Sequence, residues 1–372
     1  MIYKRNGRWS VRIDLDRDAT GKRIRRAIGV YETKKEAESA ERAALKARED
    51  GLDFDAAKST IREVCDRFVD RCRAKGLAPS TLVRYKELFR DLDAIANVKL
   101  GDLNRAHVAG VYAAAAKRGL APKTLRGVHT ALHAAVAWAA PESAALRALT
   151  VAARDLPGVP KNLARALTED EVRRLFAAAV GTPWESFVVL SLCTGARRSE
   201  LAALRWQHID FGRQTVRIAH SLTMSEDGEL YDKATKTSVE RVVPLNGLAI
   251  ETLRAHRARQ NQERLLVGPV YGSDDRIFAD ALGNPWNPRS ISNGFRRTAK
   301  AAKVKARLHD LRHSCATWLL QGGTDVRTVA AVLGHSNAVT TLTTYAHVMP
   351  GAQAQAVERI TDRLRVVGGE DA

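Results

Sequence analysis

Long apolar runs are missing from this chain of 372 residues. A helix that spans a bilayer needs about 20 consecutive apolar residues, and no run of even ~18 occurs here. The first residues, M-I-Y-K-R-N-G, also lack the apolar segment of a secretory signal. These absences predict a protein with no membrane span that works in the cytoplasm.

Cysteine is scarce as well, and its four copies form no C-x-x-C pair. Disulfide frameworks and zinc sites require paired or closely spaced cysteines. We therefore expect reduced thiols in a cytosolic protein, and neither a disulfide scaffold nor a bound metal. The cysteines are Cys65, Cys72, Cys193 and Cys315.

Acidic residues are outnumbered: 42 Asp and Glu face 60 Lys and Arg, which gives a net charge of +18. Such an excess predicts an anionic partner, and nucleic acid is the leading candidate because distributed Lys and Arg neutralise phosphates. An anionic membrane surface is the alternative. A hydrophobic fraction of 45% supports real cores, and the length predicts two or three domains.

Residues 1–30 alternate between apolar and polar residues, many of them basic, as strands do. Asn6-Gly7 predicts a hairpin turn, and D-A-T-G at 18–21 predicts a second turn before a third strand. A three-stranded sheet backed by one helix follows. Arg8 and Arg12 lie on its polar face and are candidate contacts in a DNA major groove, although a solvated basic face would look the same.

Residues 59–150 show helical spacing broken by Gly and Pro, which predicts a helical bundle. Helices are expected from Thr60 and at about 80–96, 104–118 and 122–139. Two helix starts, A-P-S-T-L and A-P-K-T-L, lie beside basic residues and are candidate phosphate sites, or simply ordinary helix caps. Those basic residues are Arg84, Lys86, Lys123 and Arg126.

Residues 151–165 lose periodicity and contain Pro157 and Pro160, which predicts a linker. From 166 to 372 we expect a mostly helical domain with a sheet insertion near 213–245. Capping boxes of Thr with Glu three residues later predict three helix starts. They are Thr33 with Glu36, Thr60 with Glu63, and Thr168 with Glu171.

Five short motifs follow one another in this third region. The order is T-G-x-R-x-S-E-L, K-T-S-x-x-R-x-V-P-L, H-x-L-R-H, L-G-H-S, and a Tyr before A-H-V, all within residues 192–348. This series resembles the tyrosine recombinases, the phage-integrase family of site-specific DNA recombinases. The resemblance extends to the arm-type DNA-binding domain at 1–55 and the helical core-binding domain at 59–150. It implies a multidomain, mainly α fold with small β-sheets and a mixed α/β catalytic domain.

The resemblance also implies a role for each matching residue. Arg197 and Arg312 match the two arginines that grip the scissile phosphate, and guanidinium forks suit phosphate oxygens. Tyr345 matches the nucleophile, a phenol with an ordinary pKa of about 10 that needs assistance at neutral pH. The remaining matches are His309 as proton acceptor or phosphate ligand, His335 as donor to a non-bridging oxygen, and Lys236 as general acid for the leaving 5′-oxygen.

Neighbouring residues compete for some of these roles. The motif register favours Arg197 over Arg198, and the distance to the V-P-L segment favours Lys236 over Lys233. We expect His313 and His347 to be structural or to act behind the catalytic groups. Glu200, Asp310 and Ser336 either orient the catalytic side chains or serve as caps and solvated groups. Trp318 and Leu319 are expected on the core face of their helix.

By resemblance, the reaction passes through a covalent 3′-phosphotyrosyl enzyme and needs neither ATP nor a metal. The working assembly would be a homotetramer on two double-stranded DNA attachment sites, with an excisionase and a DNA-bending protein as candidate accessory partners. The domain order favours integration of a phage or mobile element. Rival readings are a catalytically inactive DNA-binding relative, a metal-dependent nuclease, and a type IB topoisomerase.

Overall fold

The computed structural model describes residues 1–5, 7–17, 23–49, 54–141, 143–159, 165–234, 240–345 and 360. Internal contacts divide the chain into two compact units, Met1–Lys161 and Asn162–Ala372. The described elements are mainly helical, with a three-stranded sheet at the N-terminus and small sheets in the second unit, as expected. Within these ranges, no helix combines the length and apolarity needed to cross a bilayer.

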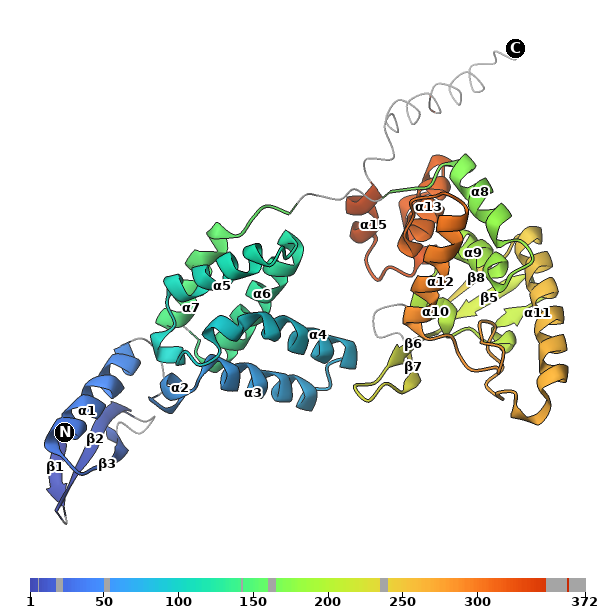
Figure 1. The fold of residues 1–372 in the computed structure, drawn as a ribbon. Helices are drawn as coiled ribbons and strands as arrows, with labels where there is room; N and C mark the ends of the chain where they lie inside the picture. Colours follow the sequence, from blue (N-terminus) through green and yellow to red (C-terminus); the bar gives the residue numbers. More distant parts are fainter. Residues whose placement is uncertain are drawn as a thin grey trace. The chain divides into compact units, whose positions relative to one another are not determined.

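An antiparallel sheet with strand order β1-β2-β3 opens the first unit (Figure 1). Arg5 pairs with Arg8, which agrees with the predicted hairpin at residues 6 and 7, while the turn predicted at 18–21 lies outside the described residues. Helix α1 packs on this sheet over the buried Val11 and Ile13. The elements are β1 Ile2–Arg5, β2 Arg8–Arg17, β3 Arg23–Tyr31 and α1 Lys34–Glu49.

The rest of the first unit is a helical bundle around one apolar core. The predicted capping box forms: Glu63 N–H donates to Thr60 Oγ1 (3.3 Å) and Thr60 N–H to Glu63 Oε2 (2.8 Å). The expected helix at 80–96 ends at Phe89 and continues as a 3₁₀ helix. The elements are α2 Phe54–Lys58, α3 Ile61–Ala74, α4 Pro79–Phe89, η1 Arg90–Ile95, η2 Leu100–Asp102, α5 Arg105–Lys117, α6 Pro122–Ala139, α7 Ala144–Ala152 and η3 Ala153–Asp155.

Helix α7 is absent from the sequence prediction. Its N-terminus is capped by Ser143, whose Oγ accepts a hydrogen bond from Leu146 N–H (3.1 Å). The side chain of Leu149 is fully buried in the bundle core, and Leu156 packs there too. The first residues of the predicted linker at 151–165 are therefore helical, because they contribute to the core of the first unit.

The second unit combines helices with two small antiparallel sheets, one ordered β4-β5-β8 and one formed by β6 and β7. Strands β5 to β8 lie within the region 213–245 where a sheet insertion was expected, and β4 precedes it. The strands are β4 Ile209–Asp210, β5 Thr215–Ile218, β6 His220–Met224, β7 Leu230–Ala234 and β8 Arg241–Pro244. The helices are α8 Glu169–Ala179, α9 Pro183–Thr194, α10 Arg198–Ala202, η4 Trp206–His208, α11 Gly247–Val267, η5 Gly268–Val270, α12 Pro288–Ala301, α13 Leu308–Gln321, α14 Val326–Leu333 and α15 Ala338–Tyr345.

Helix α9 runs through the core of this unit and packs against α8, α11 and α13. It ends at Gly195, whose φ of 58° places it in the left-handed region. A Cβ atom there would lie 2.4 Å from Leu333 Cδ2, so only glycine fits the turn. This turn directs the chain into α10 and sets the position of Arg197. On α13 the prediction for Trp318 was wrong, because that side chain is 36% exposed, whereas Leu319 is partly buried.

Candidate active site

Arg197 precedes helix α10, and its backbone and side chain are both fixed by Glu200. The Arg197 N–H donates to Glu200 Oε2 (2.9 Å), and Arg197 Nη1 donates to Oε1 (2.8 Å). The Glu200 side chain is only 1% exposed. Burial raises the pKa of this carboxyl, but the contacts with Arg241 and Arg197 outweigh it and hold the pKa below its usual value. Glu200 thus remains ionised and orients Arg197.

Arg241 is buried, and it was expected only as the arginine of the second motif, without a role of its own. Its Nη2 donates to Glu200 Oε2 (2.7 Å), and its Nε donates to the backbone oxygen of Val332 (2.7 Å). Gly334 ends α14 with φ of 68°, and a Cβ there would lie 2.6 Å from Arg241 Nη1. Arg241 therefore joins the segment before His335 to the carboxylate that holds Arg197.

Arg312 lies on α13 and is 4% exposed. Its Nη1 donates to the backbone oxygen of Gly195, while its Nη2 is buried and has no hydrogen-bond partner among the described residues. Burial and the charge of Arg197 lower its pKa to about 10, so it stays protonated at neutral pH. A buried guanidinium with an unused donor is suited to an anionic ligand.

Two histidines share this environment. Burial and the nearby arginines, Arg312 first, lower the pKa of both His309 and His335, the latter to about 4. His335 Nδ1 is hydrogen-bonded to Thr341 Oγ1 (2.7 Å). A neutral imidazole that accepts from Thr341 carries its proton on Nε2, from which it can donate to a phosphate oxygen.

Tyr345 ends α15, and its side chain is 2% exposed in a cluster with Ala316, Leu320, Val329 and Leu333. The phenol oxygen is hydrogen-bonded to Nδ1 of His313 (2.7 Å). Burial raises the pKa of Tyr345 to about 12, and burial followed by the effect of His309 lowers that of His313 to about 4. The pair is therefore neutral, with the phenol protonated.

The phenol's partner differs from the sequence expectation. His309 was the expected proton acceptor, whereas His313, expected to be structural or to act behind the catalytic groups, makes the hydrogen bond to Tyr345. His309 stacks edge-on against His313, with ring centroids 4.6 Å apart. Asp310 serves as a cap, accepting from the Arg307 N–H (2.7 Å). Lys236 and His347 lie outside the described residues.

A cleft of about 500 Å³ brings together Arg197, His309 and Arg312, with Arg296 and Arg307 also in its walls. Arg197 and Arg241 form ion pairs with the buried Glu200 carboxylate, and the charge of the same carboxylate acts on Arg312, so positive charge is in excess on this side of the cleft. In the transition state of phosphoryl transfer, negative charge is spread over the oxygens bound to phosphorus. The cleft can therefore stabilise a phosphodiester under nucleophilic attack.

The six candidate DNA-contacting residues are all exposed in the first unit. Arg84 forms an ion pair with Glu87 (3.2 Å). A Cβ atom added to Gly127 would lie close to Arg84 Nη2, so the N-terminal parts of α4 and α6 lie side by side. Exposure fits DNA contact and an ordinary solvated surface equally well. The six are Arg8, Arg12, Arg84, Lys86, Lys123 and Arg126.

Comparison with known proteins identifies the class. The phage integrase family model matches residues 165–351, and the arm DNA-binding domain model matches residues 1–47. Because the first match covers half of the chain, this protein belongs to the phage integrase family of tyrosine recombinases, enzymes that cleave and religate DNA.

Individual relatives are similar over nearly the whole chain. A tyrosine recombinase XerC-like protein of Caldanaerobacter subterraneus subsp. tengcongensis is 27% identical, covering 97% of this chain and 98% of its own. An integrase of Streptomyces ambofaciens is 29% identical, covering 94% and 92%.

Two solved structures share the fold. The Tn1549 transposon integrase bound to transposon right end DNA has a TM-score of 0.66 at 20% identity, covering 82% of this chain and 100% of its own. A lambda integrase dimer bound to a core site has a TM-score of 0.59 at 18% identity, covering 92% and 93%.

Proposed function

We propose that this protein integrates a phage or mobile genetic element by cutting and rejoining DNA through a 3′-phosphotyrosyl intermediate. The observation that carries the proposal is the buried Arg312, whose Nη2 has no partner among the described residues, in a cleft shared with Arg197 and His309. Burying an unpaired cationic donor is costly, so its retention implies an anionic ligand. A phosphodiester fits the fork geometry and the excess positive charge.

Each side chain then has a defined task. Arg197 and Arg312 hold the non-bridging oxygens, and His335 donates a hydrogen bond to one of them. Tyr345 leaves His313, loses its proton to a basic group such as His309, and attacks phosphorus. The bond from phosphorus to the 5′-oxygen breaks, and Lys236 protonates that oxygen. Removing one positioned donor is expected to slow cleavage by about 10²–10³-fold.

The proposed partners are duplex DNA attachment sites and three further copies of this chain. In solved structures a lambda integrase dimer is bound to a core site and a tetramer to a Holliday junction. Three functional parts are proposed: an arm-binding domain at 1–55, a core-binding domain at 59–150 and a catalytic domain at 166–372. An excisionase and a DNA-bending protein are proposed accessory factors in a bacterial cytoplasm.

Replacing Tyr345 by Phe tests the chemistry. A duplex site is first selected from a random pool by the full-length chain and then nicked so that cleavage traps the covalent product. Wild type is expected to give a detergent-resistant protein–DNA adduct at a 3′-phosphate, unaffected by EDTA. Tyr345→Phe should bind the duplex with unchanged affinity and give no adduct.

Tyr231→Phe is the matched control, because that tyrosine is exposed and lies outside the final motif. It should form the adduct at the wild-type rate. Binding without any adduct in wild type would instead support the rival reading, a DNA-binding relative without catalytic activity.

A further inference from the structure

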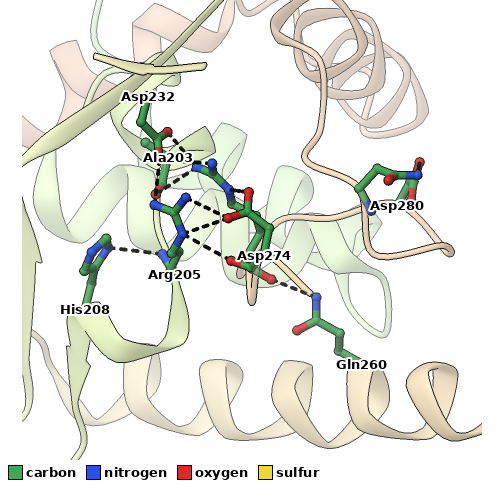
Figure 2. Close-up of polar contacts among 9 residues, drawn as sticks. Ala203, Arg205, His208, Asp232, Gln260, Asp274 and Asp280 are labelled. Atoms are coloured by element: carbon green, nitrogen blue, oxygen red, sulfur yellow. Dashed lines mark hydrogen bonds and ion pairs between the residues drawn. The ribbon is translucent and has the colours of Figure 1, made fainter. Parts of the chain in front are cut away.

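A network of two arginines and two aspartates lies in the second unit, outside the cleft described above (Figure 2). Arg276 Nη1 and Nη2 donate to the two oxygens of Asp232 (2.9 and 3.0 Å), and Arg205 Nη1 lies 2.6 Å from Asp232 Oδ2. Asp274 bridges the same two arginines, accepting from Arg205 Nη2 (2.7 Å) and Arg276 Nε (2.6 Å). We call these four residues the Arg–Asp clamp.

The two arginines of the clamp are attached to the core of the unit. The extended segments that carry them are joined by backbone hydrogen bonds, from Trp206 N–H to Asp275 oxygen (3.1 Å) and from Ile277 N–H to Leu204 oxygen (3.0 Å). Arg276 is 4% exposed and also donates to the backbone oxygen of Ala203 (3.2 Å). The arginine side of the clamp is therefore rigid.

Asp232 comes from a different element, strand β7 of the β6–β7 ribbon. This ribbon is a two-stranded sheet of its own, not hydrogen-bonded to the β4-β5-β8 sheet. Side chains therefore hold it: Leu222 is buried in the core, Leu230 packs partly against it, and Asp232 enters the clamp. An isolated two-stranded ribbon is marginally stable, so these side-chain anchors determine where its strands lie.

We propose that Asp232 is a positioning residue for the general acid Lys236, and that the Arg–Asp clamp fixes the strand from which Lys236 is delivered. Lys236 follows Asp232 by four residues, and β7 ends at Ala234, so a fixed Asp232 limits where the lysine can reach. This inference rests on the proposed function, in which Lys236 protonates the leaving 5′-oxygen.

The geometry of the clamp fixes the orientation of the Asp232 carboxylate as well as its position. The bidentate fork of Arg276 on Asp232 defines the plane of the carboxylate, and Arg205 approaches one of its oxygens from a second segment. Burial raises the pKa of Asp232, but the bonds to Arg276 and Arg205 outweigh it and keep the pKa below the usual value. The anchor therefore stays ionised at working pH. An asparagine of the same size cannot accept all three bonds.

The chemistry supplies a readout specific to the general acid. As the Tyr345 oxygen forms its bond to phosphorus, the bond to the 5′-oxygen breaks, and that oxygen takes a proton from the Lys236 ammonium. When sulfur replaces the bridging 5′-oxygen, a thiolate leaves without needing this proton, because thiols are far more acidic than alcohols. Sulfur in the substrate therefore restores the cleavage rate of a variant that is defective in proton delivery. It does not restore the rate of a variant that is defective in folding, in DNA binding or in its contacts with the phosphate.

The experiment compares single-turnover cleavage of oxygen and 5′-bridging phosphorothiolate duplexes by the full-length chain. Asp232→Asn is expected to cleave the oxygen substrate about 10²-fold more slowly, the scale of a misplaced catalytic group, and the sulfur substrate at close to the wild-type rate. Asp232→Glu, which keeps the charge, serves if Asp232→Asn fails to bind DNA, and should show a smaller defect that sulfur also rescues.

A matched control makes the same chemical change elsewhere on the ribbon. Asp227→Asn alters an exposed residue at the turn of the same ribbon and should keep the wild-type ratio of oxygen to sulfur cleavage. Asp274→Asn removes a partner of Arg205 and Arg276, so it should slow cleavage of the oxygen substrate less than Asp232→Asn does, and sulfur should rescue it. If Asp232 variants slow both substrates equally, or if Asp227→Asn behaves like Asp232→Asn, the positioning role of Asp232 is overturned.

Lys236→Ala separates failure of this inference from failure of the proposed function. Rescue of Lys236→Ala by sulfur without rescue of Asp232→Asn overturns the positioning role alone. Absence of rescue in Lys236→Ala overturns the general-acid assignment on which the inference rests. Tyr345→Phe should cleave neither substrate, which shows that the sulfur substrate is cut by the same nucleophile.

Discussion

Replacing Glu200 by Gln is the change for which the structure predicts the largest loss of stability. The Glu200 carboxylate accepts three hydrogen bonds, from Arg197 N–H, Arg197 Nη1 and Arg241 Nη2, and is 1% exposed. Gln keeps the shape but has one acceptor oxygen, so its NH₂ group must face a donor. Arg241 would then be a buried cation whose remaining acceptor is the Val332 carbonyl.

The size of the expected loss of stability in Glu200→Gln follows from these contacts. Removing one partner of a buried ion pair typically costs about 3–5 kcal/mol, because the other charge stays buried and uncompensated. Every 1.4 kcal/mol changes an equilibrium constant tenfold. Amides protected by folding of the second unit should therefore exchange with deuterium about 10²–10⁴-fold faster in Glu200→Gln.

Hydrogen-exchange mass spectrometry of the full-length chain is the assay. Peptides from α9 and α10 report on the second unit, while peptides from α3 and α6 in the first unit provide an internal control. Glu251→Gln is the matched variant, since Glu251 is exposed on α11. Exchange in α9 and α10 within about threefold of wild type would refute the reasoning, because a pair worth 3 kcal/mol cannot be lost without a larger change.

The pH dependence has a definite sign. The pKa of Glu200 is lowered in the folded protein, so its stabilisation is fully present above the ordinary carboxyl pKa of about 4.3. It is lost as the pH falls from that value through the lowered folded pKa. The difference between wild type and Glu200→Gln should therefore be constant near neutral pH and shrink below pH ~4. A difference that grew on acidification would contradict the assignment of Glu200 as an ionised partner.

Three further outcomes are expected. His313→Phe leaves the Tyr345 hydroxyl without its hydrogen bond, at a cost of about 1–3 kcal/mol. Tyr345 should then leave its buried position more often, so its nitration in the DNA-free protein should accelerate about 5- to 150-fold. An unchanged rate of nitration would mean that the bond does not restrain the nucleophile. Gly195→Ala should lower the free energy of unfolding by about 2–5 kcal/mol in urea, from the left-handed backbone and the overlap with Leu333, whereas Gly247→Ala, with open space around it, should change it little. DNA affinity should fall steeply and linearly in log–log form with salt, and a flat response would contradict phosphate contacts.

Local structure was largely readable from the sequence. The predicted capping boxes at Thr60 and Thr168 form with both reciprocal hydrogen bonds. Arg5 pairs with Arg8 on either side of the predicted hairpin turn. These features depend on side chains within about four residues of each other, so a short stretch of sequence is enough to specify them.

Contacts between distant residues were not readable in this way. Glu200 and Arg241 are 41 positions apart, and His313 and Tyr345 are 32 apart. The sequence motifs identified the residue types of the site by resemblance, but only the packing of α9, α13 and β8 decides that Arg241 shares the Glu200 carboxylate and that His313 receives the phenol. Such pairings depend on how elements pack after the chain has folded, and no local spacing encodes them. The sequence thus determined the helix caps, most elements of the first unit and the candidate chemistry, whereas the tertiary structure decided which charges meet, because burial and close packing select the partners.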